Sequence, residues 1–268
     1  MRTAGPPEIH NRHKISFPAQ VKNIIRISDI VLEIVDARYI TESRISELEE
    51  SIKEQEKMLV HVVTKIDLVD VKKLKESEQA KDLSNPVFIS CKTKEGIKNL
   101  RERIHILAKK FKDRERVHIG VIGYPNTGKS SVISILARRA AAPVSSQSGF
   151  TKSMSKIRFS KGILLLDGPG VVPTKENLFG DQDLKKHALL GVHVPESVRN
   201  PDLIVFELMK MNPGRLEKHY DIESEGDVEK LLQLLGERWI ILKKKGEVDS
   251  DKTARRILKD WHTGKIKG

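Results

Sequence analysis

A glycine-rich segment between residues 123 and 130 has the spacing of a phosphate-binding loop. It reads Gly123-Tyr-Pro-Asn-Thr-Gly128-Lys129-Ser130. Glycines let successive backbone N–H groups turn toward one anion, and a helix that begins at the lysine adds the positive end of its dipole. The Lys129 ammonium would reach the outer phosphates, and the Ser130 hydroxyl would ligate Mg²⁺. The segment predicts binding of a nucleoside triphosphate. The expected contacts come from Asn126, Thr127, Gly128, Lys129, Ser130 and Ser131.

Downstream of this loop, a short apolar run ends in an aspartate. The run Ile163-Leu-Leu-Leu-Asp167 is followed by Gly168-Pro-Gly170. An aspartate at the end of a strand, at this distance from Lys129, is expected to make the second protein contact to Mg²⁺, and the Gly170 amide would meet the γ-phosphate. Thr151, in the loop between the two motifs, would reach Mg²⁺ when the γ-phosphate is present. A plain loop residue is the alternative interpretation of Thr151.

Two further strand ends, upstream of the loop, predict which base is bound. Thr64-Lys65-Ile66-Asp67 differs at its first residue from the Asn-Lys-x-Asp signature of guanine-nucleotide binders. The Asp67 carboxylate would accept from guanine N1–H and from the exocyclic amine, a pairing that adenine cannot offer, and the Lys65 stem would lie over the base. Ser90-Cys91-Lys92 ends the next strand and would present a backbone amide to guanine O6. Cys91 is then a small packing residue and not a reactive thiol.

The order of these motifs is informative. A conventional guanine-nucleotide domain begins with the phosphate-binding loop and ends with the two base-recognition motifs. In this chain Thr64–Asp67 and Ser90–Lys92 come first, and the loop, Thr151 and Asp167–Gly170 follow. A sheet tolerates such an order if the old termini are joined and new ones are opened at the surface. The chain is therefore expected to be a circularly permuted GTPase. A phosphotransferase is disfavoured, because Thr64–Asp67 and Asp167–Gly170 fit a GTPase and a second substrate-binding loop after the phosphate-binding loop is lacking.

The motifs need strand ends and helix starts to position them. Short apolar, β-branched runs predict strands at 30–35, 58–63, 86–90, 116–122, 154–159 and 163–167. Helix-like patterns lie between them at 42–57, 71–83, 94–111 and 129–141. This alternation favours an α/β fold with a mostly parallel six-stranded sheet and helices on both faces. Leucines at helical spacings follow, which predicts a G domain over 1–175 and a small all-helical, RNA-binding domain over 176–268.

The sequence resembles the circularly permuted GTPases of the RbgA/YlqF family, which assist assembly of the large ribosomal subunit. The resemblance covers most of the chain. Besides the motifs above, it rests on Phe17-Pro18, Asp36-Ala37-Arg38, Gly149-Phe-Thr151, Asn212-Pro213, Gly226-Asp227 and Thr263-Gly264-Lys265. It implies GTP or GDP and Mg²⁺ as ligands, GTP hydrolysis that is slow in the isolated protein and stimulated by ribosomal particles, and a large-subunit precursor and its rRNA as partners.

The resemblance also bears on catalysis. Val171 stands after Asp167–Gly170, where many GTPases have a glutamine that orients the attacking water. By resemblance, Asn126 could hold a K⁺ ion that neutralises developing charge. The family has a histidine two residues after its Phe-Pro, and Gln20 takes that place here. Lys129, Thr151, Gly170 and Gln20 are thus the candidate catalytic residues, with a plain polar loop residue as the alternative for Gln20.

The charge is unevenly distributed. The net charge is +12, and residues 98–161 carry 15 basic against three acidic residues. Such a stretch predicts a phosphate-rich partner such as RNA, with a solvated surface beside the phosphate-binding loop as the alternative. A second hypothesis is a GTPase switch that acts on a protein partner. DNA binding is not expected, and a monomer is expected. No run approaches 18 apolar residues, residues 1–14 lack a signal-peptide core, and there is one cysteine, so a cytoplasmic protein is expected.

Overall fold

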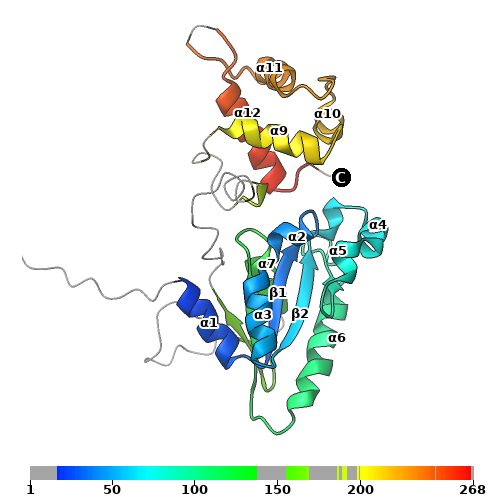
Figure 1. Cartoon of the computed structure of the whole chain (residues 1–268), viewed down its shortest axis with the longest axis vertical. Helices are drawn as coiled ribbons and strands as arrows, with labels where there is room; N and C mark the ends of the chain where they lie inside the picture. The colour runs from blue at the N-terminus through cyan, green and yellow to red at the C-terminus, as the bar shows by residue number, and fades with distance from the viewer. Residues whose placement is uncertain are drawn as a thin grey trace, which may run out of the picture.

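A computed structural model describes residues 17–137, 155–168, 186, 189–191, 198, 200–244 and 246–266. It contains a six-stranded sheet with the strand order β3-β2-β1-β4-β6-β5 (Figure 1). The strands are β1 (Ile30–Asp36), β2 (Met58–Thr64), β3 (Val87–Phe88), β4 (Val117–Gly123), β5 (Ser155–Ser160) and β6 (Ile163–Asp167). Every pairing is parallel except that of β5 with β6. The predicted mostly parallel α/β sheet is confirmed.

The register of the sheet brings the predicted motifs to one edge. Strand β1 lies between β2 and β4, with Asp36 opposite Thr64 and Ile34 opposite Gly123. On the other side of β4, Val121 lies opposite Asp167. Because parallel strands all end at the same edge of a sheet, residues that are far apart in the sequence become neighbours there. The permuted order of the motifs therefore does not change their arrangement in space.

Helices cover both faces of the sheet, as predicted. They are α1 (Phe17–Ile27), α2 (Ile40–Ser43), α3 (Ser46–Glu54), η1 (Ile66–Leu68), α4 (Val71–Glu76), α5 (Glu78–Lys81), α6 (Ile97–Ala108), η2 (Lys109–Phe111) and α7 (Lys129–Ala137). Ile24 of α1 and Ile52 of α3 belong to one hydrophobic cluster. Leu100 of α6 and Val132 of α7 belong to the cluster on the other face, so the central strands are buried on both sides.

Several predicted boundaries were wrong. Helix α1 was missed, and the helix predicted over 42–57 is divided between α2 and α3. The break comes at Arg44, which is extended, and at Ile45, which has a non-helical φ of −123° and donates its amide to the buried Glu33 carboxylate at 2.8 Å. The helix predicted over 71–83 is likewise divided at Ser77, whose hydroxyl caps α5. Strand β3 is shorter than the predicted 86–90.

The C-terminal part of the chain consists mainly of helices. They are α9 (Pro201–Met211), α10 (Arg215–Tyr220), α11 (Val228–Arg238) and α12 (Ser250–His262). An isolated antiparallel bridge joins Leu242 to Val248, a small departure from the all-helical prediction. Trp261 is fully buried, and its cluster continues through Tyr39 into the face of the sheet that α1 and α3 cover. In the described part of the chain, the helices are too short or too polar to cross a membrane.

Candidate functional site

The phosphate-binding loop connects β4 to α7 at the upper edge of the sheet. Helix α7 begins at Lys129, as the motif requires. Gly128 has φ +101°, a backbone conformation in which a residue with a side chain would be strained, so the loop needs glycine at this position. The Lys129 ammonium lies 2.8 Å from Asp167 Oδ1 at the end of β6. The two motifs predicted to bind phosphate and Mg²⁺ therefore share one site.

Thr64, the residue that departs from the guanine signature, braces this loop. Its Oγ1 lies 2.5 Å from the Thr127 carbonyl oxygen and 3.1 Å from the Val35 carbonyl oxygen. Thr64 is buried at the end of β2. A hydroxyl at this position thus ties the base-recognition segment to the phosphate-binding loop, and asparagine is not needed for that contact.

Lys65 is held by a group of charged side chains whose position beside it was not predicted from the sequence. Its Nζ lies 2.7 Å from Asp36 Oδ2 and donates to the Asn126 carbonyl at 2.7 Å. Asp36 also receives the Arg38 guanidinium, at 2.9 and 3.1 Å. Burial alone would raise the pKa of Asp36, but Arg38 and Lys65 hold it at about 2. The Lys65 stem is thereby fixed along the wall of the site.

Asp67 and the Ser90–Lys92 segment meet, as the guanine interpretation requires. Ser90 Oγ donates to Asp67 Oδ1 at 2.6 Å and accepts from the Lys92 and Thr93 amides. The Ser90 amide itself donates to the Glu95 carbonyl at 3.1 Å, so Ser90 positions Asp67 rather than offering its own N–H to a base. Among the described residues, no protein acceptor takes the Cys91 amide. Burial raises the pKa of the Cys91 thiol, in agreement with a packing role.

These residues line one cavity of about 580 Å³. It brings together residues from both base-recognition motifs and from the phosphate-binding loop: Thr64, Lys65, Asp67, Cys91, Lys92, Gly128, Ser130 and Ser131. Leu68, Ser134 and Ile135 also line it. His262, Thr263 and Gly264, at the end of α12, complete the lining, which sequence reasoning did not foresee. The Thr263-Gly264 pair was noticed only as part of the family resemblance.

The oxygen donors beside Lys129 suit Mg²⁺. Ser130 supplies a hydroxyl and Asp167 a carboxylate, and hard oxygen ligands of this kind are those that Mg²⁺ prefers. Asp167 lies against Lys129, the residue expected at the phosphates, so metal and phosphate would be adjacent. The residues present therefore fit the predicted metal.

Five predicted residues need separate mention. Thr151, Gly170 and Val171 lie outside the described residues. Gln20 lies in α1 and is half-buried. Asn126 has φ +61°, and its side-chain amide donates to the Gly191 carbonyl, so its Nδ2 faces the C-terminal half of the chain.

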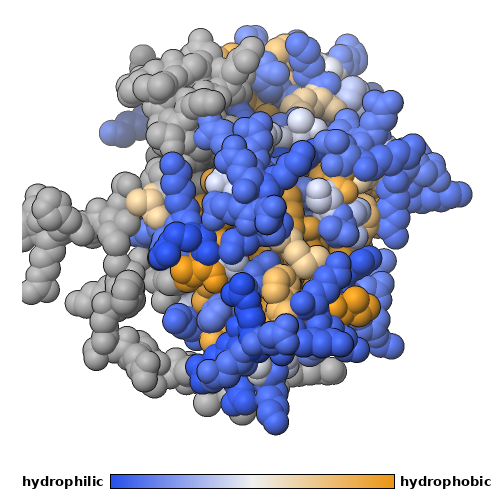
Figure 2. All heavy atoms as spheres, turned by 60° about the horizontal axis from the view of Figure 1, so that its bottom comes forward, coloured by the Kyte–Doolittle hydropathy of each residue, from blue (hydrophilic) through white to orange (hydrophobic). Residues whose placement is uncertain are grey.

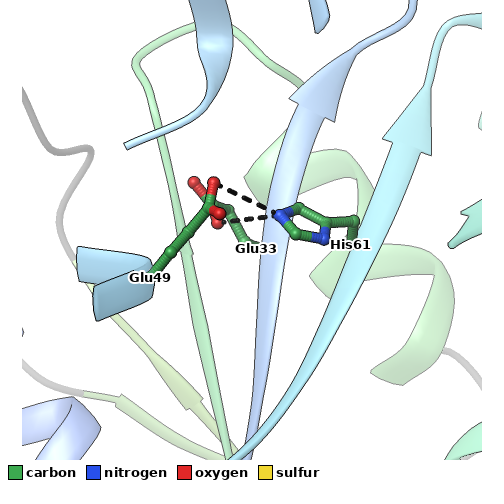
Figure 3. A group of neighbouring side chains, drawn as sticks. All are labelled: Glu33, Glu49 and His61. Atoms are coloured by element: carbon green, nitrogen blue, oxygen red, sulfur yellow. Dashed lines mark ion pairs between the residues drawn. The ribbon is translucent and has the colours of Figure 1, made fainter. Parts of the chain in front are cut away.

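A cluster of three titratable side chains lies away from the cavity, between the sheet and α3. Glu33, Glu49 and His61 point toward one another (Figure 3). His61 Nε2 lies 3.3 Å from Glu33 Oε2 and 3.4 Å from Glu49 Oε1. His61 Nδ1 lies 3.2 Å from the Ser84 carbonyl oxygen. Burial alone would lower the pKa of His61, but the carboxylates of Glu33 and Glu49 raise it to about 9. A protonated imidazole between two carboxylates makes this group a buried ion-pair contact of the fold.

Comparisons with known proteins agree with this geometry. Residues 118–242 match the family model described as "50S ribosome-binding GTPase". The match begins at β4 and leaves out the two base-recognition motifs, which a permuted chain carries upstream. A GTP-binding protein of Methanocaldococcus jannaschii is 34% identical over 94% of this chain and 66% of its own length. Nucleolar GTP-binding protein 2 of Neurospora crassa is 33% identical over 92% of this chain and 40% of its own length.

Solved structures show the same fold. GNP-bound YlqF from T. maritima covers 92% of this chain and 94% of its own, with a TM-score of 0.65 and 21% identity. The GDP-bound structure of the same protein gives a TM-score of 0.64, 22% identity and coverage of 92% and 96%. This chain spans about two thirds of the archaeal relative and less than half of the Neurospora one. The motif order, the shared cavity and these relatives lead to one conclusion: the chain belongs to the circularly permuted GTPases.

Proposed function

We propose that the protein binds GTP with Mg²⁺, hydrolyses it, and acts as a switch on a precursor of the large ribosomal subunit. One observation carries the proposal: Lys129, which pairs with Asp167, stands between Gly128 and Ser130, and these two residues line the same cavity as Asp67 and Lys65. A guanine nucleotide laid along that cavity would meet a charge for its phosphates and a carboxylate for its base. The names of the relatives point to ribosomes and the nucleolus.

The chemistry would be divided among this chain's residues. Ser130 and Asp167 would hold Mg²⁺, which when bound neutralises charge between the outer phosphates. Lys129 would leave Asp167 for the phosphate oxygens, because a triphosphate carries more negative charge than one carboxylate. Thr151 and Gly170 keep their proposed roles at Mg²⁺ and the γ-phosphate.

Gln20 and Asn126 remain the candidates to assist the attacking water. Ile24 of α1 packs so closely on Gly168 that a Cβ there would lie 2.4 Å from the Ile24 Cδ1. Gln20 lies one helical turn before Ile24, nearer the carboxyl edge of the sheet. This position supports a role beside the Asp167–Gly170 segment. Asn126 would ligate K⁺ through its side-chain oxygen Oδ1, since its Nδ2 donates to the Gly191 carbonyl.

The RNA-facing surface would be the opposite edge of the sheet. Parallel strands begin there, and the segments 109–116 and 158–161 beside the starts of β4 and β6 carry seven basic and two acidic side chains. The basic residues are all exposed: Lys109, Lys110, Lys112, Arg114, Arg116, Arg158 and Lys161. We call this set the basic edge. Figure 2 views the molecule from that end, where hydrophilic side chains cover most of the visible surface. Exposed cations of this kind bind phosphate without reading sequence.

The test is GTP turnover with and without purified large ribosomal subunits. We expect slow turnover by the protein alone and a rise of at least tenfold with subunits. Asp67→Asn serves as the control, since it should lose GTP turnover in both conditions while the protein stays folded. Fast turnover that subunits do not change, or ATP turnover equal to that of GTP, would contradict the proposal.

A second candidate is a switch that acts on a protein. An apolar groove of about 670 Å³ in the helical part is lined by Phe206, Met209 and Pro213, with Glu217, Glu223 and Glu225 around it. Phe206 is 43% exposed. A peptide with apolar and basic side chains would match this groove in shape and charge. Phe206→Ala should weaken binding to ribosomal particles only if a protein partner occupies the groove, and should leave binding to naked rRNA unchanged.

A further inference from the structure

The end of α12 belongs to the wall of the nucleotide cavity. His262, Thr263 and Gly264 share this lining with Asp67, Leu68 and Cys91, although they are about 170 to 200 residues away in sequence. Figure 1 shows α12, in red, running from the helical part toward the upper edge of the sheet. We call residues 262–264 the tail.

Two arginines hold Trp261, the residue before the tail, beside the base-recognition segment. Arg38 donates to the Trp261 carbonyl at 2.8 Å, and Arg215 donates to the Leu68 carbonyl at 2.9 Å. Both guanidinium groups also lie over the Trp261 ring, with centroid distances of 5.2 and 4.9 Å. Cation–π contacts at a buried tryptophan are stronger than at an exposed one. The residue that precedes the tail is therefore held by directional contacts from both halves of the chain.

Within the tail, Gly264 packs closely against the Leu68 side chain. Its φ is +70°, and a Cβ at this position would lie 3.0 Å from Leu68 Cδ1. Leu68 follows Asp67 directly, so the tail contacts the segment expected to read guanine. A contiguous series of contacts also runs from Lys65, which is expected to lie over the base, through Asp36 and Arg38 to Trp261, the residue before the tail.

From these contacts we infer that the tail is a nucleoside-contacting wall, and that a bound guanine nucleotide holds the helical part on the G domain. The inference rests on the proposed GTP binding. The tail meets the base side of the cavity at Leu68, and its His262 ring lies close to Gly191, which also neighbours the Asn126 side chain. The base and ribose are common to GTP and GDP. The contact therefore reports whether the cavity is occupied, and is the same in the GTP-bound and GDP-bound states. His262 supplies an imidazole that can stack on a purine or bond a ribose hydroxyl.

Dissociation rates of fluorescent GDP and GTP analogues test this. We expect His262→Ala to accelerate release of both nucleotides about tenfold and by the same factor, as the loss of one good contact would. Gly264→Ala, which pushes the tail off Leu68, should do the same. Lys259→Ala, an exposed site one turn earlier on α12, should leave both rates unchanged. Unchanged release in His262→Ala, or a change confined to GTP, overturns the inference.

A measurement on the wild-type chain guards against a variant that merely misfolds. By reciprocity, GDP should slow hydrogen exchange at the end of α12, and GTP should slow it equally. Exchange there that neither nucleotide changes overturns the inference. Failure of the proposed function is distinguishable: there, Lys129→Ala and Asp67→Asn would bind guanine nucleotides as well as the wild type does. If those two variants lose binding while His262→Ala keeps it, the inference alone fails.

Discussion

The two edges of the sheet differ in how their charged side chains are held. At the carboxyl edge, each charged side chain expected to touch nucleotide is already held: Lys129 by Asp167, Lys65 by Asp36, and Asp67 by Ser90. At the basic edge, Arg114 pairs with Asp29 and Arg116 with Glu115. In the described part of the chain, Lys109, Lys110, Lys112 and Lys161 have no ion pair.

The difference follows from what each edge would recognise. Selecting one base needs donors and acceptors within a few tenths of an ångström, so their side chains must be fixed in advance. Attraction to a phosphate backbone depends on charge and counterion release, and flexible lysines serve it well. Changes at the carboxyl edge should therefore alter specificity sharply, whereas changes at the basic edge should alter affinity gradually.

The largest effect is expected for Lys129→Ala. Loss of the ammonium removes a charge-assisted contact to the phosphates, and GTP affinity should fall by about 10³-fold. Titration with a fluorescent GTP analogue measures this. Lys109→Ala at the basic edge is the matched control and should bind GTP as the wild type does. Equal affinities for GTP in the wild type and Lys129→Ala would remove the distinction between the edges.

Next in size is Asp67→Asn. The substitution presents an amide donor to the guanine donors, so GTP affinity should fall by about 100-fold while affinity for xanthosine triphosphate rises. Competition between the two nucleotides for the wild type and the variant gives the measurement. A variant that still prefers guanine would show that the base is read elsewhere.

Asp36 sharpens the comparison through pH. Its pKa is lowered to about 2, so its ion pairs stabilise the fold above the ordinary aspartate pKa, and that stabilisation is lost as pH falls toward 2. The contribution is about 2 kcal/mol at neutral pH. The free energy of unfolding of Asp36→Asn, from urea titrations between pH 5 and pH 2.5, should be lower at pH 5 and fall less with acid. Parallel curves would contradict the assignment.

The smallest effect per residue is expected at the basic edge. Replacing Lys109, Lys110 and Lys112 together by alanine should weaken rRNA binding about tenfold at physiological salt. The slope of log affinity against log salt should become shallower by about 2, because three phosphate contacts are removed. Filter binding at several salt concentrations provides both values, and GTP affinity should stay unchanged. A salt slope equal to that of the wild type would exclude this edge as the RNA surface.

Sequence alone could predict those features that residue types specify locally. The phosphate-binding loop was found because only glycines and a lysine at fixed spacing perform that task, and Asp67 and Asp167 because each follows an apolar strand. The alternation of strands and helices fixed the sheet. The predicted helix boundaries were wrong where a tertiary contact overrode local preference. At Ile45, for example, the amide donates to the Glu33 carboxylate and not to a helical carbonyl.

Tertiary structure alone decided how the distant parts meet. Arg38 and Trp261 are 223 residues apart, and nothing in their periodicity relates them, yet their contact seats the tail on the nucleotide cavity. The same holds for the pairing of Glu33 with His61 across β1 and β2. Local patterns encode which face of an element is apolar and which turn is tight. They do not encode which distant side chain completes an ion pair or the lining of a cavity, because that depends on how the whole chain packs.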